Sequence, residues 1–147
     1  MKRALVAGLV VALAAGSALA WDAASDIKAR QAGMKQIGGN MKGLYDTLSG
    51  DKNPAKLKEY AANIQRLSGQ LPSWFPAGSG PSSGEKTKAL AAVWTDPAGF
   101  KAAGDAFKTE AAKLNAAAQT GDAAKVQAAF VATRGTCKGC HDKYQAK

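Results

Sequence analysis

Apolar residues recur at every third or fourth position in four segments of the chain, and this spacing predicts four amphipathic helices. The pattern is clearest in the first segment, residues 24–48, where Ile27, Met34, Met41 and Leu48 follow one another at intervals of seven. A stripe of this kind faces the core of a helical bundle.

Capping and turn signals separate the four segments. The second helix is predicted to begin at Asn53-Pro54 and to end at Pro72, and the third to begin at Asp96-Pro97. The sequence Thr-Gly-Asp at residues 120–122 ends the third helix and caps the fourth. Prolines, glycines and serines predict a long irregular connection within residues 72–95. Because β-branched runs are absent after the first 20 residues, the pattern predicts an all-α fold whose helices face a common bundle core.

The first 20 residues have the pattern of a secretory signal peptide. Met1 is followed by Lys2 and Arg3, then by an apolar run over residues 4–15 and an Ala-Leu-Ala cleavage sequence at residues 18–20. A membrane anchor is a weaker interpretation, because the apolar run is shorter than the roughly 20 residues that a membrane span needs. We therefore expect export to the periplasm, no membrane span, and one domain over residues 21–147.

The chain is basic, with a formal net charge of +9 at pH 7. Removal of Lys2 and Arg3 with the signal peptide would leave a charge of +7. The basic residues are dispersed, which does not favour nucleic acid as a partner. A basic surface suggests an acidic partner, although a merely solvated lysine-rich surface explains the charge equally well.

Two cysteines stand three positions apart near the end of the chain, and a histidine follows the second: Cys137, Cys140 and His141. This is the attachment signature of c-type haem, in which each thiol adds to a vinyl group and the imidazole ligates the iron. A disulfide, a zinc site and a redox dithiol are the alternatives. A structural zinc site needs four ligands, and no βαβ pattern accompanies the two cysteines. The motif therefore predicts one covalently bound haem c.

Residues 21–147 contain one histidine and two methionines, Met34 and Met41. A second imidazole ligand is therefore impossible within these residues, and a thioether is the available soft ligand for the other face of the iron. From the residues alone, core packing is the more common role of a methionine such as Met34, and ligation is the alternative.

Four predicted helices with the haem motif in the last one resemble the class II c-type cytochromes, the cytochrome c prime family. The resemblance covers residues 21–147. Beyond the haem motif, it rests on five short sequences: Arg30-Gln31 followed by Met34, the Pro/Trp/Phe loop at 72–76, Val93-Trp94-Thr95-Asp96, Thr120-Gly121-Asp122, and His141-Asp142-Lys143-Tyr144. The resemblance implies an antiparallel four-helix bundle, often dimeric, with covalently attached haem and His141 as the proximal iron ligand.

The resemblance also assigns roles to two residues of the first helix. The residue four positions after Arg30 faces the open side of the iron. It is usually Leu or Phe in five-coordinate members, whereas in low-spin members a methionine on this helix supplies the sixth ligand. Met34 stands there in this chain, so ligation by His141 and Met34 is expected. Arg30 is expected to pair with a haem propionate, and the alternative is that its side chain extends to solvent.

We therefore expect a periplasmic electron carrier that transfers single electrons through a six-coordinate haem. Its expected partners are redox proteins with acidic docking surfaces, together with a second copy of the chain in a homodimer. The alternative function is that of a five-coordinate, high-spin cytochrome c prime that binds nitric oxide or carbon monoxide. An enzyme such as a peroxidase is not expected, because peroxide cleavage benefits from a distal general base and no second histidine is present.

Overall fold

The computed structural model describes residues 22–147, so the predicted signal peptide lies outside the described residues. The described part is 79% helical and contains no strands, which confirms the predicted all-α fold. Its elements are α1 (Ala23–Ser49), α2 (Pro54–Gln70), two 3-10 turns (Leu71–Trp74 and Pro81–Ser83), α3 (Ala92–Thr95), α4 (Pro97–Gln119) and α5 (Ala123–Tyr144).

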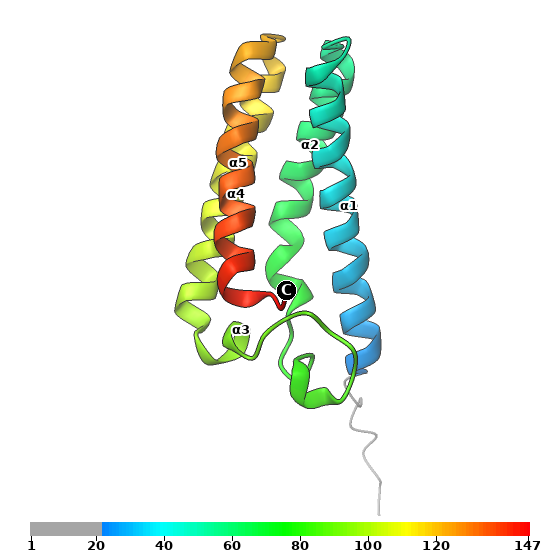
Figure 1. Ribbon diagram of the computed structural model, residues 1–147, viewed down its shortest axis with the longest axis vertical. Helices are drawn as coiled ribbons and strands as arrows, with labels where there is room; N and C mark the ends of the chain where they lie inside the picture. Colours follow the sequence, from blue (N-terminus) through cyan, green and yellow to red (C-terminus); the bar gives the residue numbers. More distant parts are fainter. Residues whose placement is uncertain (1–21) are drawn as a thin grey trace, which may run out of the picture.

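Four long helices form an antiparallel bundle, as Figure 1 shows. The chain rises through α1, returns through α2, rises again through α4 and returns through α5. The pairs α1–α2, α2–α4 and α4–α5 pack against one another over much of their length, whereas α1 and α5 touch very little. The connection between α2 and α4 passes beneath the first turns of α1 and the last turns of α5 (Figure 1).

Side-chain caps fix where the helices begin. The Asn53 side chain accepts hydrogen bonds from two backbone N–H groups of the first turn of α2, with Pro54 at the first helical position. Asp96 caps α4 in the same manner, accepting from the Gly99 N–H at 3.0 Å. Asp122 caps α5 after Gly121, whose φ of +75° suits a residue without a Cβ. These are the start signals that the sequence predicted.

The core of the bundle is filled by the predicted apolar stripes. Its fully buried large side chains come from all four long helices: Leu44, Leu57, Ile64, Leu67, Leu114 and Val126. Met34 and Met41 are only half-buried and pack against the edge of this core. Some apolar residues of α1 therefore pack in the core, and others face the space between α1 and α5.

The long connection is held to the bundle by large side chains. Trp74 lies against Gly33 of α1, where an added Cβ would overlap its ring. Phe75 packs edge-on against Phe100 of α4, with ring centroids 4.7 Å apart. These contacts keep the connection close to one end of the gap between α1 and α5.

No helix within residues 22–147 combines the length and the apolar character that crossing a membrane would require.

Candidate haem site

A cavity of about 1040 Å³ lies between α1 and α5. One wall comes from α1 and the other from α5, and α4 contributes its floor. Its lining is mostly apolar and includes Ile37, Phe100, Phe107 and Phe130. The cavity exists because α1 and α5 do not pack against each other, while each packs on its other neighbour. Its volume matches the upper end of the range for cofactor pockets, roughly 300–1,000 Å³.

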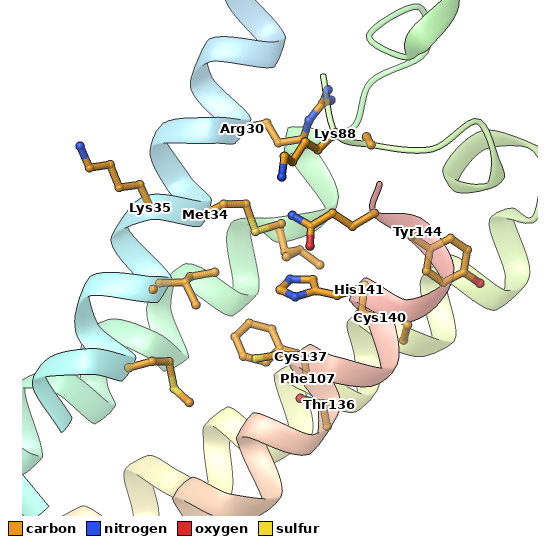
Figure 2. A pocket seen from close by; sticks show the side chains of 18 of the residues that line it. Arg30, Met34, Lys35, Lys88, Phe107, Thr136, Cys137, Cys140, His141 and Tyr144 are labelled. Carbon is orange, nitrogen blue, oxygen red and sulfur yellow. The ribbon is translucent and has the colours of Figure 1, made fainter. Parts of the chain in front are cut away.

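The three residues of the haem motif all line this cavity from the last turns of α5. Residues three and four apart share a helix face, which brings the Cys137, Cys140 and His141 side chains to one wall. Both cysteines are half-buried, and the ring of His141 projects into the cavity (Figure 2). Burial raises the pKa of both thiols, and the Cys137 thiol also contacts the Thr133 carbonyl at 3.5 Å.

The opposite wall comes from α1. Met34 reaches into the cavity from this helix and faces His141 across it (Figure 2). Ile37 and Met41 continue the same wall along α1. These three side chains carry no nitrogen or oxygen, so they offer a molecule in the cavity an apolar surface, while Gln31, Lys35 and Lys42 of the same helix add polar groups to the lining.

Arg30 lies at the end of the cavity and is buried, with 4% of its surface exposed. Its guanidinium donates four hydrogen bonds to the connection: to the Ser79 hydroxyl at 2.9 Å, the Ser79 carbonyl at 2.9 Å, the Thr87 hydroxyl at 2.9 Å and the Trp74 carbonyl at 3.2 Å. Burial lowers the pKa of Arg30, and the charge of Asp26 opposes this effect. The alternative in which Arg30 extends to solvent is therefore wrong.

A hydrogen bond also anchors the end of α5 beside the cavity. The Tyr144 hydroxyl donates to the Asp96 carboxylate at 2.8 Å. This bond, with a second from the Gly99 N–H, holds the pKa of Asp96 below its usual range, and the same contact raises the pKa of Tyr144. Tyr144 follows His141 by three residues, so the contact fixes the helix turn that carries the imidazole.

These residues fit a covalently attached haem. Two thiols and an imidazole share one wall of a cavity that is large, mostly apolar and open to a flat ligand. The alternatives fit less well. The two thiols are not bonded to each other, and no group of three or more His, Cys, Asp or Glu side chains in residues 22–147 is arranged to hold a metal ion.

The sequence predicted the residues of the α5 wall, but it missed two groups that complete the site. Phe107 of α4 forms the floor, and Thr87 and Lys88 of the connection close one end. Phe107 lies seven residues after Phe100 and seven before Leu114, at the spacing of a helix face, so its burial could be foreseen. No periodic signal marks Thr87 or Lys88, which lie in the irregular connection.

Comparison with known proteins identifies the family. A family model described as Cytochrome C' matches residues 25–145. The chain is 44% identical to cytochrome c' of Rubrivivax gelatinosus over 107 residues, which cover 71% of this chain and 82% of the relative.

Solved structures agree with this match. A nitric oxide complex of a variant of cytochrome c prime from Alcaligenes xylosoxidans superposes with a TM-score of 0.77 at 29% identity, over 85% of this chain and 97% of that one. A second cytochrome c', which shows an unusual ligand-controlled dimer dissociation, gives a TM-score of 0.80 at 27% identity, over 85% of this chain and 97% of the other.

These comparisons contradict one expectation. The prediction of an electron carrier with His141 and Met34 as axial ligands is wrong, because the relatives are cytochromes c', which hold a five-coordinate haem that binds nitric oxide or carbon monoxide. The physical reason is that a thioether is both a soft metal ligand and a flexible filler of irregular gaps. Met34 packs against the core from the edge of the cavity, which is the second of these roles.

Members of this family are periplasmic haem proteins of bacteria that carry electrons or bind gases. The match spans all four long helices and the segment that contains both cysteines and the histidine. This chain therefore belongs to the cytochrome c' family and carries one covalently attached c-type haem.

Proposed function

We propose that this protein binds nitric oxide or carbon monoxide at a five-coordinate haem, with thioether bonds from Cys137 and Cys140 and His141 as the proximal ligand. One observation carries the proposal. The α1 side chain that faces His141 across the cavity is the apolar Met34, and Ile37 and Met41 line the same wall, which Gln31, Lys35 and Lys42 also line. Together with the comparison to gas-binding relatives, this favours an iron that keeps one coordination position open.

Each residue of the site has a distinct task in this proposal. The bound haem supplies an open coordination position that a small diatomic gas can take. Cys137 and Cys140 fix the haem to α5, so that its orientation is set by a rigid helix. His141 holds the iron from the α5 side. Phe107 closes the floor and keeps water away from that part of the cavity.

Met34, Ile37 and Met41 favour an uncharged ligand at the position opposite His141. A water molecule or an anion on that side would lose hydrogen bonds on leaving solvent, and no polar side chain from Met34, Ile37 or Met41 replaces them. A neutral diatomic gas loses little on the same transfer. Selectivity therefore arises because these three side chains form no hydrogen bonds with a ligand, rather than from a specific contact.

The surroundings of the cavity suit an acidic partner. Lys35, Lys88 and Arg134 line the cavity, and no acidic side chain is among the lining residues in the described part of the chain. A protein with an acidic surface that supplies electrons to the haem is the partner this charge favours.

We further propose export to the periplasm by residues 1–20, a single domain over residues 21–147, and a homodimer, as in the solved cytochrome c' with ligand-controlled dimer dissociation. Intact mass of the exported protein would test cleavage after Ala20.

Carbon monoxide titration of the reduced holoprotein tests the proposed function. We expect one gas molecule bound per haem, with a spectrum in the unliganded state typical of high-spin iron. Met34→Leu should leave the spin state unchanged, because the thioether is not a ligand. Met41→Leu is the matched control, since this methionine lies two turns further along the same wall.

Two results would contradict the proposed function. A wild-type protein that is low-spin and takes up no carbon monoxide, but becomes high-spin and gas-binding in Met34→Leu, would contradict the proposal. A protein whose haem is released by denaturation would contradict the attachment through Cys137 and Cys140.

A further inference from the structure

The spacing between the two walls of the cavity needs an explanation. Helices α1 and α5 carry Met34 and His141 on opposite sides, yet the helices make few contacts with each other. Elsewhere in the bundle, neighbouring helices are held apart by packed side chains. Between α1 and α5 another element must set the distance.

Residues 87–90 of the connection, which we name the strap, span this gap at one end of the cavity. Thr87, Lys88 and Ala89 of the strap all line the cavity. Figure 2 shows Lys88 beside Arg30, above the level of Met34 and His141. The strap therefore closes the end of the space in which the haem would sit.

On one side, the strap is bonded to the end of α5. The Leu90 N–H donates to the Tyr144 carbonyl at 2.9 Å, and the Ala146 N–H donates to the Lys88 carbonyl at 2.8 Å. Ala89 and Gln145 form an isolated antiparallel bridge between these bonds. This short pairing begins three residues after His141, so the strap and the imidazole share one rigid end of α5.

On the other side, the strap is bonded to α1 through Arg30. The guanidinium donates to the Thr87 hydroxyl at 2.9 Å and, by its other hydrogen bonds, grips Ser79 and the Trp74 carbonyl. The rings of Phe75 and Trp94 cover the guanidinium, with centroids 4.9 and 5.8 Å from its central carbon. Arg30 lies one helical turn before Met34, so its position and that of the α1 wall are linked.

We infer that Arg30 is a positioning residue, which holds α1 at a fixed distance from His141 by clamping the strap, and thereby limits gas entry to the cavity. This inference rests on the proposed gas-binding function. It differs from an action of Arg30 on the haem itself, because it requires Thr87 as an intermediary. Loosening the strap should open the end of the cavity and speed gas association.

Thr87→Val tests this inference because it leaves Arg30, both thiols and His141 in place. The matched control is Thr95→Val, which removes a hydroxyl that donates only to the Ala91 carbonyl within the same connection. Two measurements on the holoprotein are compared: hydrogen exchange of the Leu90 and Ala146 amides, and the association rate of carbon monoxide after flash photolysis of the reduced form.

Thr87→Val removes the hydroxyl that accepts from Arg30 and, at 3.1 Å, from the Ala89 N–H. We expect exchange of both amides to accelerate by at least on the order of tenfold, which is the scale set by loss of a hydrogen bond to a charged group. Carbon monoxide association should also become several-fold faster. Thr95→Val should match the wild type in both measurements. Arg30→Lys keeps the charge but replaces the planar set of guanidinium N–H donors by a single ammonium group. This variant should resemble Thr87→Val in both measurements.

Three results would overturn the inference. The first is a Thr87→Val protein that behaves as Thr95→Val does. The second is faster exchange with an unchanged association rate, which would make the strap structural only. The third is a change in Arg30→Lys that Thr87→Val does not share, which would show that Arg30 acts without Thr87 as an intermediary. A wild type that binds no carbon monoxide would instead overturn the proposed function, and the exchange comparison would still decide whether Arg30 holds the strap.

Discussion

His141 is the only imidazole in the sequence, and the structure places it on the wall of the cavity beside both cysteines. If it is the proximal ligand, His141→Gly should leave the haem covalently attached but change the spectrum of the reduced carbon monoxide complex. Added imidazole should restore that spectrum, because the variant leaves room for it. Gln145→Ala, another cavity-lining change on the same segment, is the control. A His141→Gly spectrum identical to that of the wild type would exclude this role.

The bond between Tyr144 and Asp96 makes stability depend on pH. Because the hydrogen bond lowers the folded-state pKa of Asp96, its contribution is complete above about pH 4, the value for an unperturbed aspartate, and is lost as the pH falls through the folded-state pKa. The raised pKa of Tyr144 likewise means that the contribution is present below about pH 10 and is lost at higher pH. Lys143 also acts on Asp96, in the same direction as the tyrosine.

Tyr144→Phe should therefore lower the thermal midpoint at pH 7 and have progressively less effect as the pH is lowered below 4. Circular dichroism melts of the holoprotein at pH 7 and pH 3 would measure this. An equal difference between variant and wild type at both values would show that the Tyr144 hydroxyl contributes independently of the charge of Asp96, since the variant keeps the ring that packs against Phe100.

At the scale of elements, the helix α1 has glycines with opposite surroundings. An added Cβ at Gly39 meets no atom within 4 Å, and this residue is exposed. Gly39→Ala should raise the free energy of unfolding by about 0.5–1 kcal/mol, because alanine loses less backbone entropy in a helix. Chemical denaturation would measure the change.

Gly33→Ala is the counterpart on the same helix. Its Cβ would overlap the ring of Trp74, so the connection would have to shift. This variant should be destabilised. If both alanines stabilised the protein equally, then Trp74 would not be packed on α1 as the structure describes.

The starts of α2, α4 and α5 could be predicted from the sequence because their signals are local. Asn53, Asp96 and Asp122 cap N–H groups two or three residues away, and no distant part of the chain is needed to recognise them. The end of the connection could be predicted less well. The sequence predicts an irregular connection within residues 72–95, whereas the short helix α3 forms at Ala92–Thr95 and the residues before it pair with the end of α5.

The whole molecule combines a dense core with a cavity, and the two should respond differently to mutation. Leu114 is fully buried and does not line the cavity. Leu114→Ala should lower the free energy of unfolding by about 2–5 kcal/mol through lost burial and the void it leaves, with the haem spectrum unchanged. Val131→Ala, at a side chain that is 58% exposed, should change stability by less than about 0.5 kcal/mol. A large spectral change in Leu114→Ala would mean that the core and the cavity are not independent.

Only part of the candidate site could be predicted from the sequence alone. The thiols and the imidazole could be predicted because their chemistry is carried by five consecutive residues. The role of Met34 could not, because ligation depends on where its sulfur lies relative to the iron, and the same residue type fills gaps in cores. The partners of Arg30 could not either, because Ser79 and Thr87 lie 49 and 57 residues away along the chain.

The spin state of the wild-type iron tests the central claim most directly. Electron paramagnetic resonance of the oxidised protein, together with optical spectra of both oxidation states, reports whether a side chain occupies the position opposite His141. We predict high-spin iron in both states and prompt binding of carbon monoxide after reduction. Low-spin oxidised iron with a methionine–iron charge-transfer band, and no carbon monoxide binding by the reduced protein, would contradict this account.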